Sequence, residues 1–466
     1  MLLFKYLNYI RYFLKIREKI KNKEFIYVLA KYKDFLPLNL KLFLLYKTGL
    51  YNKIIENIDY KKYIYYDISK VALGYKFSYE SNNAFLSKYR NNISFILGIL
   101  PYNPTLALDC LCHKKYYLLK LFILYHLGQK IDFVPNKINH PDLYLLCNND
   151  SVNSNIENIN KYLDYYNLSK IRFINKEANN FINNIITSQF SSPAQIDDLP
   201  LVSILMTTFN SEKWIEWSIN SLLSQTYSNI EIIIIDDSST DSTISIIEKL
   251  KRKSDKIKLI KLSKNVGTYV AKNIGISLAK GEFITCQDSD DWAHPQKIML
   301  QIYPLLENPN LVVTFSQWFR IYNDGKAYAR GVFPLTRLNP SSALFRKDIV
   351  IEKIGLWDCV RTGADSEFNA RLKLVFGNEL CLTIKKPLTI GTHRKDSLMT
   401  SSDTGYINGI SLERLNYWES WNLWHISEIE KGRVPYYLLN NKRPFNISDK
   451  NKVDYKDIIC NLCSIK

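Results

Sequence analysis

The chain has 466 residues, a net charge of +17 and a sequence pI near 9.2. This length exceeds that of a usual single domain and predicts two folding units, each able to bury a core. The charge favours an anionic partner, which could be nucleic acid, a phosphorylated ligand, an acidic polymer or a membrane surface, and charge alone does not choose among them. The eight cysteines lack the regular spacing of a disulfide framework, which favours a reducing cytoplasm.

Residues 1–190 are rich in Leu, Ile and Tyr at helical spacing and predict an all-helical N-terminal domain. Within it, LKLFLLYKTG at 40–49 returns as LKLFILYHLG at 119–128, which fits helical hairpins in a solenoid-like array. Residues 1–25 carry seven basic and two acidic side chains among large apolar ones. That pattern suits an amphipathic helix on an anionic membrane, or a first helix packed on its own domain. The chain contains no uncharged apolar run of 18 residues, so we expect no transmembrane helix.

A stretch at 191–200 that contains Pro, Ser and Asp predicts a linker, after which the hydrophobic pattern of the sequence changes. In residues 201–404, buried-strand runs such as LVSILMTTFN and IEIIIID alternate with helical segments such as SEKWIEWSINSLLSQ. This alternation predicts an α/β domain with a mixed, mainly parallel, Rossmann-like sheet. Residues 405–466 predict a short helical tail, in which three tryptophans at three-residue spacing indicate a packing face or a sugar-stacking face.

Three polar clusters, TTFN, DDSSTDS and QDSDD, follow predicted strands of this domain. Ligands of parallel sheets bind beyond the carboxyl ends of the strands, so we expect the clusters to converge on one crevice. Asp288 and Asp290 in CQDSDDWAHP are one residue apart, and their oxygens suit Mg²⁺ or Mn²⁺. The domain contains neither G-x-G-x-x-G nor G-x-x-x-x-G-K-[ST], which disfavours a dinucleotide oxidoreductase or a P-loop phosphotransferase.

Two further carboxylate positions have competing interpretations. Asp237 ends a strand and could accept a hydrogen bond from a base edge, or serve in a loop and helix cap. Asp365 and Glu367 in TGADSEFNARL open a predicted helix. A carboxylate there either caps the helix or acts as the general base that takes a proton from an acceptor hydroxyl.

Together, VSILMTTFNSEKWIEWSINSLLSQTYSNIEIIIIDDSSTDSTISII, KNVGTYVAKNIGISLAKGEFITCQDSDDWAHPQKI and GADSEFNARL resemble the inverting GT-A glycosyltransferases of family 2, over about residues 200–400. QWFRIYNDGK, SSALFRKDI, GADSEF and DTGYI further resemble bacterial capsule enzymes of the heparosan glucuronyltransferase type, which also carry a long helical N-terminal region.

The resemblance implies a role for each matching residue. The nucleotide-sugar pocket would contain Thr208, Asn210, Asp237 on uracil, Lys272, Asp288 and Ser289. Asp288 and Asp290 correspond to the D-x-D motif of the family and would bind Mn²⁺ or Mg²⁺, with His393 as a further ligand. Asp365 falls on the catalytic base of the family and is preferred over Glu367, while Asp291 shapes the turn.

The expected function is metal-dependent, inverting transfer of a sugar from a UDP-sugar, best UDP-glucuronic acid, to a growing capsule or other surface polysaccharide. A UDP-N-acetylhexosamine or another UDP-hexose is the alternative donor, and a scaffold of a polysaccharide-assembly complex is the alternative class. Expected partners are the donor, the acceptor, a second glycosyltransferase and the anionic inner face of the bacterial cytoplasmic membrane, with no nucleic acid. Four arginines could meet a sugar carboxylate: Arg320, Arg346, Arg361 and Arg371.

Overall fold

A computed structural model describes residues 14–75, 79–131, 140–147, 151–175, 177, 180–187, 199–394, 397, 399–401, 404–405, 410–439 and 442–465. Most of the predicted linker and the first thirteen residues of the predicted membrane segment lie outside these ranges. Among the described residues, no helix has the length and apolarity that crossing a membrane requires. All eight cysteines are described and all are free thiols.

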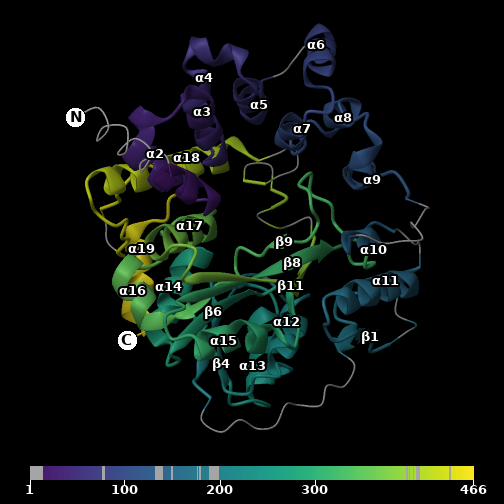
Figure 1. Cartoon of the computed structure of the whole chain (residues 1–466). Coiled ribbons are helices and arrows are strands. Elements are labelled where there is room, and N and C mark those ends of the chain that lie inside the picture. Colours follow the sequence, from purple (N-terminus) through teal and green to yellow (C-terminus); the bar gives the residue numbers. More distant parts are fainter. Residues whose placement is uncertain are drawn as a thin grey trace.

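The N-terminal region is mostly helical. Its α-helices are α2 (Phe25–Tyr32), α3 (Leu38–Lys47), α4 (Tyr51–Ile55), α5 (Ile64–Ala72), α6 (Tyr79–Tyr89), α7 (Ile93–Ile99), α8 (Pro104–Asp109), α9 (Tyr117–His126), α10 (Asp142–Leu146) and α11 (Val152–Tyr165). The two similar sequence segments fall on α3 and α9, and a true repeat architecture stays a prediction. The helices form an arc from α2, beside the C-terminal helix α18 (Leu412–Glu430), to α10 and α11 on the far side of the sheet (Figure 1).

The prediction that residues 1–190 are entirely helical is wrong at their end. Strands β1 (Ile171–Phe173) and β2 (Ile185–Thr187) form a two-stranded antiparallel sheet. Ile171, Phe173 and Ile185 are buried in the same apolar cluster as α11, so burial stabilises strands too short to be detected from periodicity.

A nine-stranded mixed sheet forms the centre of the second region, as predicted. Its strands are β3 (Val202–Thr208), β4 (Ile230–Asp236), β5 (Ile257–Lys261), β6 (Phe283–Asp288), β7 (Trp292–Ala293), β8 (Val313–Ile321), β9 (Arg337–Leu338), β10 (Leu344–Arg346) and β11 (Cys381–Thr392). Their order is β5-β4-β3-β6-β10-β8-β11-β7, with β9 on β8. The first four strands are parallel, β10 is antiparallel to both of its neighbours, and β11 is parallel to β8.

Both faces of the sheet are covered, which explains why its central strands are continuous apolar runs rather than alternating ones. In β4, Ile232 and Ile234 pack toward α12 (Ile215–Leu223), α13 (Thr243–Lys251) and α15 (Lys297–Glu307). Ile233 and Ile235 pack on the other face, toward α14 (Thr268–Leu278) and α17 (Ala364–Phe376). All seven residues of β4 are buried.

The predicted C-terminal tail is helical, in α18 and α19 (Tyr455–Ile465), but it completes the core of the sheet domain. Trp421 and Trp424 are buried in one apolar cluster with α14 and α17. Trp418 packs partly buried against that cluster. The aromatic face of α18 is therefore a packing surface, and not a sugar-stacking one.

The N-terminal region also holds a loop of the sheet domain, residues 322–336 between β8 and β9, which we call the clamped loop. Hydroxyl and side-chain amide groups donate to its carbonyls: Tyr125 Oη to Ala327 O at 2.6 Å and Asn155 Nδ2 to Asp324 O at 2.9 Å. Buried Asp142, at the start of α10, accepts from Leu335 N at 2.8 Å and from Thr336 Oγ1 at 2.5 Å. These bonds hold the clamped loop in place near the carboxyl ends of β8 and β11.

We expect Asp142→Ala to lower the free energy of unfolding by about 1 to 3 kcal/mol, because two buried main-chain N–H groups and a hydroxyl lose their acceptor. Urea unfolding of the full chain measures the change. Asp324→Ala is the control in the same loop, since its carboxylate is 44% exposed and, among the described residues, contacts the ammonium and the main-chain N–H of Lys326, so its effect stays below about 1 kcal/mol. Equal losses in the two variants would show that Asp142 does not anchor the loop.

Candidate active site

The carboxyl ends of three parallel strands bring the predicted polar clusters to one edge of the sheet. Strand register pairs Thr207 with Asp288 and Thr208 with Asp236. The last residues of β3, β4 and β6 therefore lie side by side, and the loops that follow them start at the same end of the sheet. This convergence was predicted from the strand pattern, and it places Thr208, Asp237 and Asp288 in one site.

The part of the site that is predicted to bind the nucleotide contains buried polar atoms without a partner among the described residues. Thr208 Oγ1 and Asp236 Oδ1 are buried and make no hydrogen bond in the described structure. Buried polar groups are nearly always paired, so unpaired ones at a strand edge indicate a ligand position. Asn210 follows with a positive φ of 46°, and its Oδ1 accepts from Thr240 N at 2.8 Å.

Asp237 directly follows β4, and its carboxylate has a structural role in the loop before α14. Its two oxygens accept from Val266 N at 2.8 Å and Gly267 N at 2.7 Å, just before α14. Burial raises the pKa of Asp237, and these amides oppose that rise. Each oxygen can still accept a further bond, so the loop role and base recognition are compatible.

The acidic turn after β6 gives its three carboxylates different surroundings. Asp288 accepts from Ser341 Oγ at 3.0 Å, and Asp290 forms an ion pair with Arg394 at 2.8 Å. Asp291 is buried, and its Oδ1 accepts from Thr392 N at 3.2 Å. Burial, followed by the charges of Asp290 and Asp288, raises the pKa of Asp291 well above its ordinary value. The turn is therefore shaped by Asp291, while the other two carboxylates face polar or charged groups.

Ser289, in the middle of the turn, is buried, and its hydroxyl lies 3.1 Å from Ser211 Oγ. This contact ties the acidic turn to the loop after β3. Ser289 is thus positioned between the two clusters predicted to contact the nucleotide-sugar.

Asp288 and Asp290 fit the oxygen donors that Mn²⁺ or Mg²⁺ prefers, but the structure does not bring His393 to them. The described residues contain no group of three His, Cys, Asp or Glu side chains close enough to hold a metal. The His393 ring stacks on Tyr328 at 3.7 Å between centroids. Burial, followed by the charge of Arg320, lowers the pKa of His393 to about 4, which keeps the ring neutral. Its role as a ligand stays a prediction.

Asp365 opens α17 and meets Lys272 from α14. Lys272 Nζ donates to Asp365 Oδ1 at 2.9 Å, and the side chains are 1% and 16% exposed. Burial raises the pKa of Asp365 above its ordinary value, Lys272 opposes the rise and Asp288 adds to it. A raised carboxyl pKa makes Asp365 a stronger proton acceptor, which suits a general base.

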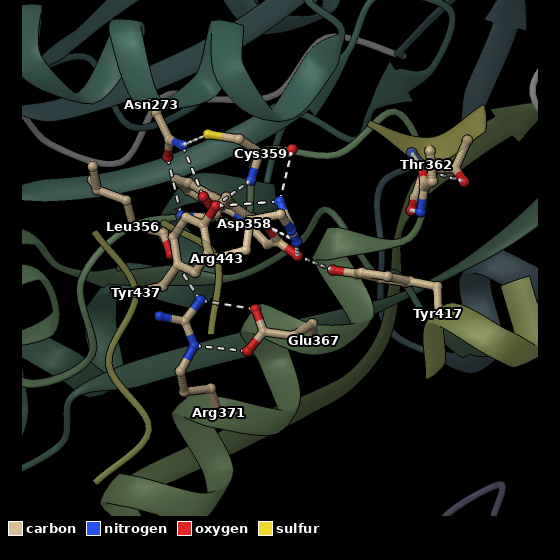
Figure 2. A network of polar contacts seen from close by, with 12 residues as sticks. Asn273, Leu356, Asp358, Cys359, Thr362, Glu367, Arg371, Tyr417, Tyr437 and Arg443 are labelled. Carbon is tan, nitrogen blue, oxygen red and sulfur yellow. Dashed lines mark hydrogen bonds and ion pairs between the residues drawn. The ribbon is translucent and has the colours of Figure 1, made fainter. Parts of the chain in front are cut away.

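The competing carboxylate, Glu367, is buried in the core. Its two oxygens accept from Arg371 Nε and Nη2, each at 2.8 Å, and Oε1 also lies 2.9 Å from His425 Nε2. In Figure 2 the pair lies beside a second buried pair, in which Arg443 donates to both oxygens of Asp358. Glu367 is 0% exposed, and both of its oxygens are occupied by Arg371, which supports the choice of Asp365.

The raised pKa of Asp365 predicts the pH dependence of the reaction. If Asp365 is the general base, it must be deprotonated to act, so kcat/KM falls on the acid side through a pKa above the ordinary 3.8. Lys272→Gln removes the positive charge that lowers this pKa and leaves burial in place, so the acid limb moves to higher pH. A pH profile of kcat/KM for both proteins measures the shift. An unchanged or lowered limb in Lys272→Gln would contradict the assignment.

Sequence reasoning missed several residues around the carboxylates. Ser341 approaches Asp288 from the segment between β9 and β10, and Arg394 reaches Asp290 from the end of β11. Tyr269, one turn before Lys272 on α14, has its ring 5.3 Å from Lys272 Nζ. Only Arg394 had a signal, because it directly follows His393 in the quoted GTHRKDSL segment.

A separate cavity of about 380 Å³ lies between β2 and α12. Glu216, Trp217 and Trp292 are among its lining residues, and none of the predicted site residues is. It is therefore distinct from the crevice edge at the acidic turn.

The comparisons with known proteins identify the class as that of the glycosyltransferases. Residues 203–360 match the family model described as Glycosyl transferase family 2, so this part of the chain is similar to the family 2 glycosyltransferase domain. The mixed sheet, the helical N-terminal region and the C-terminal helix agree with the expected GT-A-like arrangement.

Curated relatives match stretches that make up about a quarter to a third of the chain. UDP-Glc:alpha-D-GlcNAc-diphosphoundecaprenol beta-1,3-glucosyltransferase WfaP of Escherichia coli is 40% identical over 121 residues, 26% of this chain and 47% of that protein. Hyaluronan synthase of Pasteurella multocida is 31% identical over 138 residues, 30% of this chain and 14% of that protein. The chain thus spans about half, or less, of the length of the curated relatives it matches. Among solved structures, S. aureus TarS 1-349 in complex with UDP-GlcNAc has a TM-score of 0.39 and 20% identity, covering 49% of this chain and 66% of that one.

Proposed function

We propose that the chain is a metal-dependent, inverting glycosyltransferase that moves a sugar from a UDP-sugar, best UDP-glucuronic acid, to a hydroxyl of a growing capsule or other surface polysaccharide. The observation that carries the proposal is the pairing of Asp365 with Lys272 at the same strand edge as the acidic turn. A base poised beside a carboxylate turn matches single displacement at an anomeric carbon.

The residues of this chain divide the reaction between them. Thr208, Asn210 and Asp237 hold the nucleotide, and Asp288 and Asp290 are the residues that would hold Mn²⁺ or Mg²⁺. A bound divalent cation supplies positive charge beside the departing diphosphate. Asp365 accepts the proton of the acceptor hydroxyl as its oxygen attacks the anomeric carbon from the face opposite the diphosphate, which inverts the configuration.

Names of relatives support a role in polysaccharide synthesis. They include a hyaluronan synthase and a chondroitin synthase of Pasteurella multocida, each 31% identical over 138 residues. We extend this class of acceptor to the present chain. The sequence has one D-x-D motif, so this chain adds one sugar, and a second transferase adds the other in an alternating polymer. The +17 charge supports attachment to the anionic inner face of the cytoplasmic membrane.

The alternative donors are a UDP-N-acetylhexosamine or another UDP-hexose. The alternative class is a scaffold, in which the helical region recruits other enzymes. The packing of that region speaks for a direct role in the transferase, because Phe319 and Ile390 of the sheet share an apolar cluster with α9 and α11. A chain lacking residues 1–190 that stays soluble and fully active would favour the scaffold reading.

We expect Asp290→Ala to abolish Mn²⁺-dependent binding of UDP and to lower transfer below detection, because the turn loses a carboxylate toward the cation. Calorimetric titration of UDP with Mn²⁺ or with EDTA measures binding, and UDP release measures turnover. Asp255→Ala is the matched control, an exposed carboxylate just before β5 at the opposite edge of the sheet. Mn²⁺-dependent UDP binding equal to wild type in Asp290→Ala would refute the cation site.

A further inference from the structure

The structure separates the four arginines that the sequence offered for a sugar carboxylate. Three are engaged inside the protein. Their partners are Glu282 with two main-chain carbonyls for Arg346, the side chain and carbonyl of Asn265 for Arg361, and Glu367 with two main-chain carbonyls for Arg371. The sugar-contact prediction is wrong for Arg371, which is 0% exposed in the core.

Arg320, near the end of β8, is different. It is 5% exposed, and its Nη2 donates to Thr392 O. Its Nε and Nη1 are buried and make no hydrogen bond within the described residues. The carboxyl group of Asp291 lies close enough for its charge to interact with that of Arg320, but no carboxylate of the described residues forms an ion pair with the guanidinium. Buried N–H groups without an acceptor are costly, so a ligand oxyanion that accepts hydrogen bonds from Nε and Nη1 stabilises the arrangement.

The immediate neighbours of Arg320 add donors and rings. The indole of Trp318 lies 5.3 Å from the guanidinium carbon, and its Nε1 is also buried without a partner. The guanidinium carbon of Arg337 lies 6.0 Å from the same indole. Unpaired N–H groups from two side chains, with no carboxylate in ion-pair contact with Arg320 among the described residues, select an oxyanion rather than a cation or a neutral hydroxyl.

Arg320 is connected to the acidic turn through hydrogen bonds of Thr392. Thr392, whose carbonyl accepts from Arg320, donates its N–H to Asp291 Oδ1 at 3.2 Å and its hydroxyl to Asp290 O at 2.7 Å. Tyr328 of the clamped loop lies 5.8 Å from the guanidinium carbon and stacks on His393. Both rings are half-buried.

Resting on the proposed function, we propose that Arg320 and Trp318 form a subsite for the carboxylate of an acidic sugar. The guanidinium and the indole N–H bind the two carboxylate oxygens. The acidic turn, which is connected to Arg320 through Thr392, binds the diphosphate. The sugar belongs either to the donor, as a uronic acid on UDP, or to the acceptor, as a uronic acid in the glycan. The subsite thereby sets the preference of the enzyme for acidic over neutral sugars.

Equilibrium binding to the full chain with Mn²⁺ present tests the proposal in two arms. The donor arm compares UDP-glucuronic acid with UDP-glucose, and the acceptor arm compares a uronic acid oligosaccharide with its carboxyl-reduced form. In either the donor arm or the acceptor arm, we expect the wild-type protein to bind the acidic ligand at least about 10-fold more tightly than the neutral one, because the carboxylate forms a charge-assisted hydrogen bond. Arg320→Met removes this difference and leaves the affinity for the neutral ligand within about 3-fold.

Two further variants keep the test independent of folding. Trp318→Phe keeps the ring and removes one N–H, so the preference falls by a smaller factor of about 3 to 5. Arg346→Met removes a largely buried arginine that pairs with the first residue of β6, at the end of the strands away from the acidic turn, and leaves the preference unchanged. The proposal is overturned if wild type shows no preference in either arm, or if Arg320→Met and Trp318→Phe keep it. A chain that binds the acidic ligand through Arg320 but transfers no sugar contradicts only the proposed function.

Discussion

Asp365→Asn lowers kcat by about 10²- to 10⁴-fold while UDP binding stays at the wild-type level, because the variant loses only the ability to accept a proton. The amide oxygen of Asn can still accept the bond that Lys272 Nζ donates to Asp365, so the local geometry is kept. Steady-state kinetics of UDP release and calorimetric titration of UDP measure the two quantities separately.

Ser366→Ala is the control for Asp365→Asn, since Ser366 is the exposed next residue on α17 and lies outside the contacts described above. Its kcat stays within about 2-fold of wild type, as expected for a surface change. Wild-type turnover by Asp365→Asn would remove Asp365 from the chemistry. Loss of UDP binding together with kcat would assign it to donor binding instead.

Arg371→Met lowers the free energy of unfolding by about 3 to 5 kcal/mol, because it leaves the buried Glu367 carboxylate without its bidentate partner. Glu367 is 0% exposed, and the positive charge of Arg371 holds its pKa below the ordinary value against the opposing effect of burial. Urea unfolding of the full chain measures the loss. UDP release at low temperature continues, because neither residue contacts the acidic turn.

The double variant Glu367→Leu, Arg371→Met distinguishes the loss of the ion pair from the cost of leaving the Glu367 carboxylate buried and unpaired. If the single-variant loss comes from an uncompensated carboxylate, the double variant regains much of the stability, as buried ion pairs replaced by apolar side chains do. Stability equal to that of Arg371→Met would show that packing of the guanidinium, which lies 5.5 Å from the Phe368 ring, is what matters.

Much of the sheet domain was predictable because its strands are buried on both faces. IEIIIID became β4 with every residue buried, and the strand-end clusters converged because parallel strands end at one edge. The antiparallel insertion of β10 between β6 and β8 was not predictable, since three residues carry no periodic signal. The same holds for β1 and β2.

The partners of the site residues were the least predictable part. Lys272 and Asp365 are 93 positions apart, and their ion pair depends on the packing of α14 against α17. Arg443 reaches Asp358 across 85 positions from a segment with no regular structure (Figure 2). Residue type and local spacing found the carboxylates, and the family resemblance already favoured Asp365 over Glu367, a choice that the burial of Glu367 supports. Only the structure set Arg320 apart from the other three arginines.

The most direct measurement of the central claim is a panel of UDP-sugars incubated with the full chain, Mn²⁺ and oligosaccharide acceptors, with UDP release and product mass recorded. We expect one donor, for which UDP-glucuronic acid is the first candidate, to release UDP and to extend the acceptor by one sugar. EDTA or Asp290→Ala abolishes both UDP release and acceptor extension. Absence of UDP release from every donor in the presence of Mn²⁺, by a folded chain, would contradict it.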